Sequence, residues 1–593
     1  MKPQSMKPGA APLCVLKFGS SVLGSETDYD AAAQEVFRHV RRGEKVIAVV
    51  SALAGETDAL LAQGEQVGGR GSTPHAAMMA RLARVGELRS AALMGLALGR
   101  IGVRTGVLDP HEIGLEADGD PMDANLCALD RHAVSDVLHS NEALVVPGFT
   151  AVHARFGAVT LGRGGTDLTA VFFAAQCGAA RVRLIKDVDG VYAQDPVENP
   201  DAERYAELDY DAAARVSTGL IQPKAIAAAK AANVVMEVAA MGSGDATRIC
   251  RAPARKAPAR PVRRLRVALL GCGAVGAGVL AHLCSRPDLF DINPVLVRNT
   301  LSRPGGGAVR FTNDLHAALA GEPDLVVELM GGADLPADIM ASALSHGRHV
   351  VTANKAAMAR HYDRLHTAAC DGGVRLSFSA AVGGGTPVLE TLERLAASGG
   401  TVRIEGVMNG TANFLLDRLA AGDPFDAAVK EAQRLGFAEA DPAADVDGHD
   451  AADKLSLLIR AAFGAAVDPA QIAKDSLADI DPAAVKSAHE EGLAFKQIGC
   501  CELAGDGRVQ AEVRVRAVPA HHPLAGARNE ENRFVLTGAD GSEHALFGKG
   551  AGRWPTAAAV FADIMDIHRG LSEPDAVDFA ASVPARAPAL LRA

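Results

Sequence analysis

The sequence is poor in aromatic side chains, with one Trp and five Tyr in 593 residues. Single-stranded nucleic acids bind largely by stacking bases on such side chains, so this function is disfavoured. An excess of basic residues is also missing, because 71 acidic side chains outnumber 60 basic ones and give a formal net charge of -11. This balance argues against a general nucleic-acid or membrane-surface binder and favours small-molecule partners.

Disulfide frameworks and long apolar runs are missing as well. The nine cysteines are scattered without a Cys-x-x-Cys pair, which is typical of reduced thiols in a cytoplasm. No uninterrupted apolar run reaches the roughly 18 residues of a membrane-spanning helix. The first 12 residues contain no apolar stretch of the length that a secretory signal needs. We therefore expect a cytoplasmic protein that neither enters nor crosses a membrane.

The composition divides the chain into segments. Residues 251–264 alternate Ala, Pro and Arg without an apolar period that could bury a face, which indicates a linker. Before this segment, apolar runs such as Val46–Val50 and Val182–Ile185 alternate with Ala-rich helical stretches, which predicts an α/β domain with a largely parallel sheet. We expect a tail at 1–12, this domain at 13–245 and the linker at 246–264.

The α/β pattern restarts at the apolar run Leu265–Leu270 and continues to about residue 395. Beyond that point, long helical patterns such as Ala451–Phe463 mix with alternating strands such as Val509–Val515. We therefore expect a second α/β domain at 265–395 and an α+β catalytic domain at 396–545.

A glycine-rich turn follows the apolar run at Leu265–Leu270. It reads Gly271-Cys-Gly273-Ala274-Val275-Gly276 and leads into a helical pattern. Glycines at this spacing allow a tight turn, close approach of the backbone to a pyrophosphate and close packing of helix on strand. The motif predicts a Rossmann dinucleotide-binding domain, and the alternative is a purely structural glycine turn.

No acidic residue follows the second predicted strand of this domain, Val295–Val297. An acid at that position binds the ribose 2′-hydroxyl of NAD, whereas an arginine accepts the 2′-phosphate of NADP. Arg298 and Arg303 stand there instead. They favour NADPH over NADH, unless both arginines are simply solvated.

Polar residues with catalytic potential occur at two further places. Thr352 and Lys355 end a predicted strand at the edge where open α/β sheets bind ligands, and such a lysine can hold a carbonyl or carboxylate, or lie free on the surface. Asp450 and Lys454 are four positions apart on a predicted helix, with Asp445 just before them. They share a face either as an exposed ion pair or as acid and base groups for an amino-acid substrate.

These residues lie in a series of motifs that strongly resembles homoserine dehydrogenase. The motifs are Gly271–Gly276, Thr352–Lys355, Ala381–Pro387, Gly406–Phe414, Gly436–Lys454 and Gly548–Thr556. The resemblance implies reduction of L-aspartate 4-semialdehyde to L-homoserine by NAD(P)H.

The resemblance also implies roles for individual residues. Lys454 would donate the proton to the aldehyde oxygen, Asp450 would orient or assist it, and Lys355 would polarise the reacting group beside the nicotinamide. The amino-acid end of the substrate would be held by Gly436, Glu439 and Asp445. The nucleotide site would be completed by Thr352, Gly550 and Gly552. The two glycines belong to a segment at 546–584 that we expect to return to the nucleotide-binding domain, and a tail follows at 585–593.

Two residues depart from the family's pattern. The family commonly has an acid at the position of Ser379, where it joins backbone carbonyls in a sodium site; the carbonyls here would be those of Val382, Gly384 and Thr386. Loss of the charge weakens the case for Na⁺. Lys549 stands where the family usually has Pro, and it adds a charge near the nucleotide.

The first half carries a second series of motifs. A predicted strand ends in Lys17-Phe-Gly19-Ser-Ser21, a lysine and a turn of small residues suited to cradling phosphate oxygens. It is followed by Thr57, Gly86-Glu87, Gly162–Asp167 and Lys186–Tyr192. This series resembles the amino-acid kinase family, and the Gly-Glu pair and the segment around Asp167 point to aspartate kinase within it. We therefore expect an amino-acid-kinase-like α/β domain fused to the Rossmann domain and to the α+β catalytic and dimerisation domain.

This resemblance too implies roles. Lys17 would neutralise the transferring phosphoryl group, and Asp167 would organise the lysines around it. Glu87 and Arg163 would bind the ammonium and α-carboxylate of aspartate, with Thr57 beside them. The ATP site, with Mg²⁺ bridging the phosphates, would be lined by Asp187, Tyr192 and Lys224.

The kinase match has departures that leave alternatives open. The segments Lys17–Ser21 and Thr218–Lys224 resemble glutamate 5-kinase as much as aspartate kinase. Gly219 stands where aspartate kinases have a nucleotide-binding lysine, whose role Lys224 would take over, and Lys186 stands where the family usually has Thr. We predict an aspartate kinase fused to a homoserine dehydrogenase, as a homodimer or homotetramer. Another carboxylate kinase, or an inactive domain kept for binding or assembly, are the alternatives. The interval between Val238 and Leu265 is too short for paired regulatory domains, so we expect little inhibition by threonine.

Overall fold

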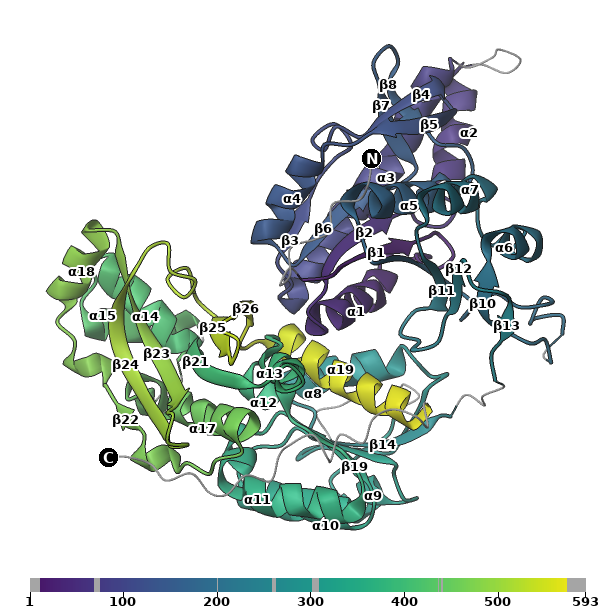
Figure 1. Cartoon of the computed structure of the whole chain (residues 1–593). Coiled ribbons are helices and arrows are strands. Elements are labelled where there is room, and N and C mark those ends of the chain that lie inside the picture. Colours follow the sequence, from purple (N-terminus) through teal and green to yellow (C-terminus); the bar gives the residue numbers. More distant parts are fainter. Residues whose placement is uncertain are drawn as a thin grey trace. The chain divides into compact units, whose positions relative to one another are not determined.

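The computed structural model describes residues 11–68, 75–199, 201–258, 263–300, 309–435, 437–438 and 441–572. The chain divides into two compact units, Met1–Pro261 and Val262–Ala593, each with its own sheets and helices (Figure 1). Within the described residues, no helix combines the length and the apolar character needed to span a membrane.

The first unit is built on a nine-stranded sheet of order β13-β10-β12-β11-β9-β1-β2-β6-β3. Its central strands are parallel and buried on both faces, so they appear in the sequence as continuous apolar runs. The strands are β1 (Leu13–Phe18), β2 (Lys45–Val50), β3 (Thr105–Val107), β6 (Ala143–Pro147), β9 (Arg181–Lys186), β10 (Tyr205–Asp209), β11 (Met236–Ala240), β12 (Thr247–Cys250) and β13 (Arg255–Lys256).

Helices cover this sheet, and a small four-stranded sheet adjoins it. Alternate residues of β1, such as Val15, pack in one core cluster with Leu168 of α5 and Ile226 of α7. The helices are α1 (Asp28–Arg41), α2 (Glu56–Gly68), α3 (Ala76–Ile101), α4 (Arg131–Ser140), α5 (Gly165–Cys177), α6 (Tyr210–Val216) and α7 (Pro223–Ala232), and the small sheet contains β4 (Glu116–Asp120), β5 (Asp123–Ala128), β7 (Thr150–His153) and β8 (Gly157–Thr160).

The linker predicted at 246–264 is shorter than expected. β12 pairs with β10 and β11, and β13 pairs with the edge strand β10. Thr247 and Ile249 are fully buried, because every second residue of this short segment enters the core. The first domain therefore runs past residue 245, and the boundary between the two units lies at 261–262.

The second unit begins with a parallel sheet of order β17-β16-β14-β18-β19-β20, with β15 also paired to β14. Along β14, Val267 and Leu269 pack with α8, whereas Ala268 and Leu270 pack in the cluster that contains α10 and α11. The elements are β14 (Leu265–Leu270), α8 (Ala274–Cys284), β15 (Phe290–Ile292), β16 (Val295–Leu296), β17 (Phe311–Thr312), α9 (Leu315–Leu319), β18 (Leu325–Glu328), α10 (Asp334–Ser345), β19 (His349–Thr352), α11 (Lys355–Gly372), β20 (Leu376–Ser377) and α12 (Ser379–Val382).

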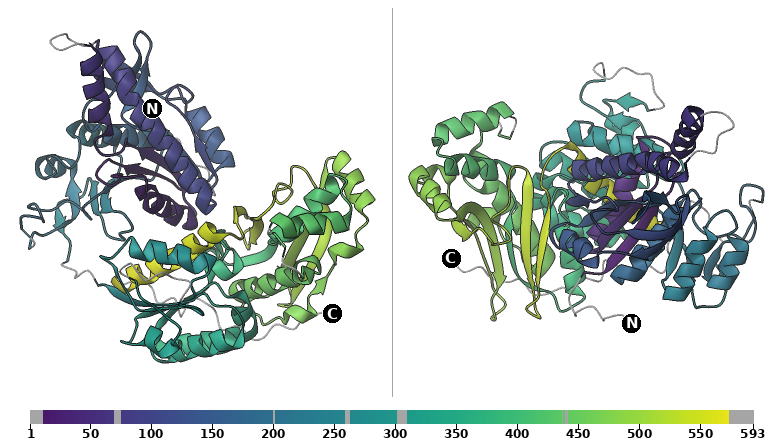
Figure 2. Two further views of the ribbon diagram at one scale, coloured as in Figure 1. Left: turned by 180° about the vertical axis from the view of Figure 1, so that it is seen from behind. Right: turned by 90° about the horizontal axis from the view of Figure 1, so that it is seen from above.

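A six-stranded sheet of order β22-β24-β23-β21-β25-β26 follows, and α14, α17 and α18 pack against its long strand β23 (Figure 2). β26 extends to residue 549, so the catalytic domain ends later than the predicted residue 545. The elements are α13 (Val388–Ala396), β21 (Thr401–Val407), α14 (Gly410–Ala420), α15 (Phe425–Leu435), α16 (Ala443–Val446), α17 (His449–Phe463), the 3-10 turns η1 (Pro469–Gln471) and η2 (Leu477–Asp479), β22 (Ala473–Lys474), α18 (Pro482–Glu490), β23 (Leu493–Leu503), β24 (Val509–Pro519), β25 (Glu531–Gly538) and β26 (Glu543–Lys549).

The last helix, α19 (Arg553–Ser572), lies alongside α8 of the parallel sheet domain (Figure 1). The Phe561 ring stacks on His282 with ring centroids 5.0 Å apart. A Cβ atom added at Gly278 would lie 2.8 Å from the Cβ of Ala557, so the two helices approach closely at a glycine. The chain thus crosses back to the glycine-rich helix after the six-stranded sheet. Residues 573–584 of the expected return, and both expected tails apart from residues 11 and 12, lie outside the described residues.

Candidate functional site

The turn between β14 and α8 forms a cradle at the N-terminus of the helix. Gly271 has a φ of +101°, and a Cβ atom there would lie 2.4 Å from the backbone oxygen of Leu329. At Gly276 a Cβ atom would lie 2.2 Å from the carbonyl oxygen of Gly271. At Gly273, in contrast, no described atom lies within 4 Å of such a Cβ. The turn therefore needs glycine at two positions for its own packing and leaves open space at Gly273, before Ala274 and Val275, which fits a dinucleotide pyrophosphate.

Arg298 follows β16 by two residues and is exposed. A Cβ atom at Gly331, in the loop after β18, would lie 3.8 Å from Arg298 Nη2. The guanidinium group therefore reaches along the carboxyl edge of the sheet. Arg303 lies outside the described residues.

A buried carboxylate ties the ends of β18 and β19 together. Glu328 is fully buried and accepts hydrogen bonds from the Thr352 hydroxyl at 2.7 Å and the Met330 N–H at 2.7 Å. Burial raises the pKa of Glu328. Thr352 in turn accepts the N–H of Asn354, whose side chain caps α11. The strand end that precedes Lys355 is thus fixed, and the sequence analysis missed Glu328 because it ends an otherwise apolar run.

Asp450 lies between two lysines from different helices. Its carboxylate pairs with the ammonium group of Lys454 at 2.9 Å, one turn along α17, and with that of Lys355 at the start of α11. Lys454 also donates a hydrogen bond to the backbone oxygen of Met408 at 2.6 Å. Although burial raises its pKa, the charges of Lys454 and Lys355 hold the pKa of Asp450 well below its usual range.

Asn409 links this ion triad to Asp445. Its side-chain amide donates to Asp445 at 2.7 Å and to Asp450 at 2.9 Å, and its oxygen accepts the Ala412 N–H at the start of α14. Three of the predicted residues, Asp445, Asp450 and Lys454, therefore belong to one hydrogen-bonded cluster. Gly436 and Glu439 lie outside the described residues. Asn409 lies in a quoted motif, but only the fold reveals that it bridges two carboxylates.

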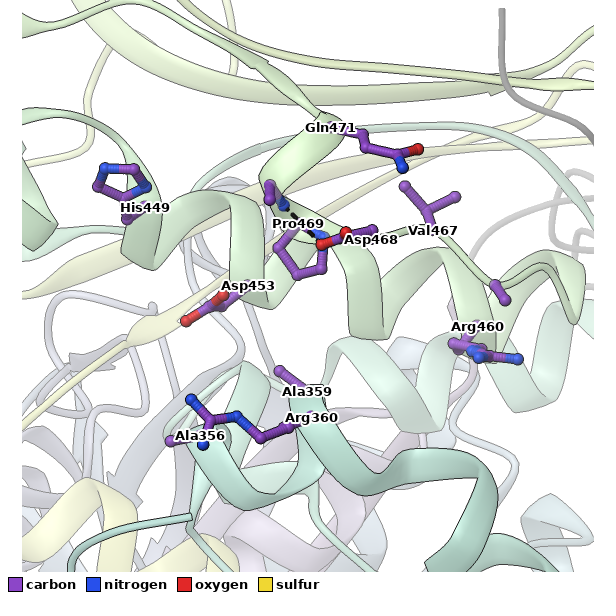
Figure 3. A pocket seen from close by; sticks show the side chains of 12 residues that line it. Ala356, Ala359, Arg360, His449, Asp453, Arg460, Val467, Asp468, Pro469 and Gln471 are labelled. Carbon is purple, nitrogen blue, oxygen red and sulfur yellow. Dashed lines mark hydrogen bonds between the residues drawn. The ribbon is translucent and has the colours of Figure 1, made fainter. Parts of the chain in front are cut away.

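A cavity of about 760 Å³ opens beside this cluster between α11, α17 and the segment at 466–471 (Figure 3). Asp453 and His449 line it from the face of α17 next to that of Asp450. Burial raises the pKa of Asp453. Arg360 lies across from Asp453 and pairs with Asp334 at 3.3 Å. Of the predicted site residues that the structure describes, none lines this cavity.

The first unit gathers a second charged cluster at the carboxyl ends of β1 and β9. The ammonium group of Lys17 lies 2.7 Å from one oxygen of Asp167, and that of Lys186 lies 3.2 Å from the other. All three residues are under a tenth exposed. Despite its burial, the two ammonium groups lower the pKa of Asp167. A Cβ atom at Gly19 would lie 2.5 Å from Lys17 Nζ, so a side chain there would displace the Lys17 ammonium group from its present position.

Glu87 lies on α3 and is almost fully buried. Burial raises its pKa to about 8, while the N–H of Ala52, 2.8 Å away, and the charge of Lys17 oppose the rise. Thr57 lies in the first turn of α2. Arg163 is exposed, and its backbone oxygen accepts a hydrogen bond from Gln222.

The predicted ATP-site residues lie on three segments. Asp187 is exposed directly after β9. Tyr192 donates its hydroxyl to Asp189 at 2.6 Å, and burial together with Asp189 raises its pKa to about 12. The ammonium group of Lys224, on α7, lies 2.5 Å from Asp123 of β5. Lys224 therefore forms its ion pair with Asp123, whereas Gln222, two residues earlier, donates its backbone N–H to Asp167 at 3.3 Å.

Comparisons with known proteins match nearly the whole described chain. Residues 387–565 match the family model of homoserine dehydrogenase, residues 271–379 match that of the homoserine dehydrogenase NAD-binding domain, and residues 12–239 match that of the amino acid kinase family. The homoserine dehydrogenase of Synechocystis is 35% identical over 318 residues, which cover 51% of this chain and 73% of the relative. That of Bacillus subtilis is 32% identical over 322 residues, covering 52% and 74%.

The chain belongs to the homoserine dehydrogenase family. A solved homoserine dehydrogenase from Thiobacillus denitrificans agrees, with a TM-score of 0.50, 32% identity, and coverage of 54% of this chain and 76% of that one. The predicted fold class and the predicted fusion of a homoserine dehydrogenase with an amino-acid kinase domain are confirmed. The dinucleotide-binding domain is confirmed as well.

The loop expected to hold sodium in this homoserine dehydrogenase packs against the late glycine segment. A Cβ atom at Gly384 would lie 2.4 Å from the carbonyl oxygen of Gly550, and one at Gly550 would lie 2.2 Å from Asn532. The Thr386 carbonyl accepts the N–H of Val388 at 2.8 Å. With Val382, Gly384 and Thr386 the loop offers backbone carbonyls and the buried Thr386 hydroxyl, which has no hydrogen-bond partner among the described residues. None of these oxygens carries a full negative charge, so the loop by itself is a weak donor set for a cation.

Two charged residues lie near this loop, and the sequence did not predict the first. Asp563 of α19 is 3% exposed and accepts the N–H of Ser379 at 3.3 Å, so a carboxylate reaches the position where the family's acid is replaced. Lys549 pairs with Glu530 at 3.1 Å, so its added charge is compensated. Gly552 has a φ of +110°, which suits the turn that leads into α19.

One further cluster in the kinase unit resembles a metal site but is an ion-pair network. Ligand atoms of Cys14, His39 and Glu44 lie within 4.8 Å of one another. Glu44 pairs with His39 at 2.5 Å and with Arg181 at 2.8 Å. The Arg181 guanidinium group therefore already compensates the charge of the Glu44 carboxylate. Burial raises the pKa of Cys14 to about 12, which keeps the thiol protonated.

Proposed function

We propose that this chain reduces L-aspartate 4-semialdehyde to L-homoserine with NADPH in its second half and phosphorylates L-aspartate with ATP in its first half. The first activity is that of the family to which the chain belongs. This proposal includes the residues assigned to both reactions, the choice of NADPH and the amino acid that the kinase half uses.

The ion triad of Asp450 is the observation that supports the dehydrogenase mechanism. NADPH, held at the Gly271–Gly276 turn, would supply hydride to the aldehyde carbon. Lys454 is held by Asp450 and the Met408 carbonyl, so one of its protons can pass to the aldehyde oxygen as negative charge develops there. Lys355 shares the same carboxylate and can polarise the same oxygen.

The substrate's amino-acid end would lie near Asp445. The carboxylate of Asp445 accepts a hydrogen bond from the Asn409 amide, which also donates to Asp450. One amide therefore fixes the distance between Asp445, which would bind the substrate's ammonium group, and Asp450, which holds the proton donor Lys454. Gly436 and Glu439 complete this part of the proposal.

The choice of NADPH rests on Arg298. It is exposed at the carboxyl edge of the sheet, where an arginine can accept the 2′-phosphate. We also propose that the 382–386 loop binds Na⁺ without the charge of the family's acid, which Ser379 replaces. We also propose a homodimer or homotetramer, on the resemblance of the region after residue 396 to the family's dimer; sedimentation of the whole chain tests it.

The kinase assignment is supported by the buried cluster of Lys17 and Asp167. Lys17 carries the charge that would neutralise the phosphoryl group, and Asp167 fixes its position. Glu87 is close enough to Lys17 for the lysine's charge to lower its pKa. This position suits a carboxylate that binds the ammonium group of aspartate beside the phosphoryl group. Arg163 and Thr57 would take the rest of the amino acid, and Asp187, Tyr192 and Lys224 the nucleotide.

One observation favours an alternative for the first half. Lys224, the residue expected to replace the missing nucleotide-binding lysine, is paired with Asp123. A domain that binds ligands or assembles the protein without turnover would tolerate this pairing. Formation of aspartyl hydroxamate from aspartate, ATP and hydroxylamine by the purified chain separates the two functions, because only an active kinase makes the acyl phosphate that hydroxylamine traps.

A further inference from the structure

Lys186 lies beside Lys17 because their strands are parallel neighbours. In the register of β1 and β9, Lys17 stands opposite Leu184 and Phe18 opposite Ile185, so both strands end at the same edge of the sheet. The two ammonium groups bind the two oxygens of one carboxylate, at 2.7 Å and 3.2 Å. The resemblance to aspartate kinase predicted no lysine at position 186.

The charges of this cluster do not balance. Two lysines and one aspartate give a net charge of +1, and the three residues are 6%, 8% and 2% exposed. Among the described residues, Asp167 is the only carboxylate within ion-pair distance of Lys17 or Lys186. Glu87 adds no full negative charge at neutral pH, because burial raises its pKa to about 8. A buried charge without a partner is costly, so the cluster is suited to an anion that supplies the missing charge.

Backbone groups around the cluster also suit an anion. Asp167 lies in the first turn of α5, a helix of 13 residues whose N-terminus therefore points to the same place. Gly164, directly before this helix, has a φ of +79°, and Gly19 leaves room for the Lys17 ammonium group. A Cβ atom at Gly164 would lie 3.2 Å from the Cβ of Gln222, so of the two glycines only Gly19 keeps a side chain away from the lysines.

We propose that Lys186 is a further catalytic residue of the kinase half, which binds the transferring phosphoryl group of ATP together with Lys17. This inference rests on the kinase function proposed above. It assigns the second ammonium group to Lys186, whereas Lys224 is held by Asp123 on the small sheet.

The chemistry needs only positive charge at this place. A carboxylate oxygen of aspartate forms a bond to the γ-phosphorus of ATP, the bond from that phosphorus to the bridging oxygen breaks, and ADP leaves with the electron pair. No proton is transferred, because the nucleophile is already ionised. Negative charge on the phosphoryl oxygens is stabilised by the ammonium groups of Lys17 and Lys186, while Asp167 binds both groups and so fixes their positions.

The test compares Lys186→Ala and Lys186→Arg with a matched surface control, Lys230→Ala. Lys230 is about half exposed on α7 and pairs with Asp211. All variants are made in the full chain, homoserine oxidation reports that the second half is intact, and Lys186→Arg keeps the buried charge in the first half. The readouts are ATP-dependent formation of aspartyl hydroxamate, its dependence on pH, and binding of ATP and ADP by calorimetry.

Loss of a charge that acts on the phosphoryl group lowers kcat by about 100-fold in Lys186→Ala. The KM for aspartate stays within about twofold, and Lys186→Arg restores most of the rate. Burial and the charge of Lys17 lower the pKa of Lys186 to about 8 against the pull of Asp167. At saturating aspartate, kcat/KM for ATP therefore falls as pH rises above about 8, and Lys186→Arg moves this fall to higher pH. If Lys186 had only a structural role, Lys186→Arg would not shift the pH at which kcat/KM for ATP falls.

A Lys186→Ala enzyme with the wild-type kcat and pH profile would overturn this inference and leave the kinase function standing. If the wild type makes no hydroxamate, the kinase function fails, and binding decides about Lys186. The inference then requires that the wild type binds ATP more tightly than ADP and that Lys186→Ala removes the difference. An unchanged ratio of the two affinities, or no binding of either nucleotide, contradicts it.

Discussion

Asp450 and Lys454 form an ion pair of 2.9 Å one turn apart on α17, and the same carboxylate also binds Lys355 from the start of α11. A pair at this spacing is usually an exposed contact of little energetic value. Here the side chains of Asp450 and Lys454 are only 12% and 14% exposed, and Lys355 comes from the nucleotide-binding part of the unit. In the function proposed above, this pair would hold the proton donor Lys454 close to the nucleotide-binding part of the unit.

Replacing Lys454 by Ala should lower kcat for homoserine oxidation by about 100-fold or more, because the group that exchanges the proton is removed. Binding of NADPH, followed by fluorescence titration, should stay close to that of the wild type. Lys486→Ala, at an exposed site on α18, is the matched control and should keep full activity. Wild-type turnover in Lys454→Ala would show that another group supplies the proton.

Two glycines of the dinucleotide turn should respond differently to alanine. Gly273→Ala places a methyl group in open space, so thermal stability should change little while the KM for NADPH rises at least about tenfold. Gly276→Ala places the methyl 2.2 Å from the Gly271 carbonyl oxygen, so it should lower the unfolding temperature as well. Thermal unfolding and steady-state kinetics of both variants check this. Equal effects of the two on stability would contradict the assignment of Gly273 to the cofactor.

Replacing Arg298 by Ala should reduce kcat/KM for NADPH about tenfold or more and leave that for NADH nearly unchanged, because a charge-assisted contact to the 2′-phosphate is lost. Arg364→Ala is the control, since Arg364 is about half exposed on α11 and pairs with Asp338. The ratio of the two specificity constants measures the effect. An unchanged ratio would mean that Arg298 is only solvated.

Glu87 gives a pH prediction for the kinase half. Its pKa is raised to about 8 by burial, so the free site holds a neutral carboxyl group at pH 7 and a carboxylate above pH 8. Because the carboxylate binds an ammonium group better, kcat/KM for aspartate should rise as pH increases through about 8 at saturating ATP. Glu87→Gln should be slow at every pH and should lack this rise. A rise that persists in Glu87→Gln would assign it to another group.

The sequence predicted the elements that local patterns determine. The buried parallel strands, the glycine turn before α8 and the pairing of Asp450 with Lys454 follow from apolar runs, glycine spacing and helical periodicity. β12 was missed because its four residues precede a segment rich in Ala, Pro and Arg, and only the strands beside it supply the partners that make it a strand.

The missed site residues depend on contacts between distant parts of the chain. Glu328 meets Thr352 across two strands, Asn409 joins Asp445 to Asp450, and Asp563 reaches Ser379 from a helix that begins 174 residues later in the sequence, at Arg553. Lys186 was noted only as a departure from a family pattern. Its meaning depends on the register of β1 and β9, which brings it to Asp167.

We propose above all that one chain carries both an active homoserine dehydrogenase and an active aspartate kinase. The most direct measurement is ATP-dependent formation of aspartyl phosphate by the purified chain, trapped as the hydroxamate, with homoserine oxidation followed in the same sample and with Lys17→Ala as the comparison. We predict that the wild type catalyses both reactions and that Lys17→Ala loses hydroxamate formation while it keeps homoserine oxidation. Homoserine oxidation without any hydroxamate formation by the wild type would contradict the claim and make the first half a binding or assembly domain.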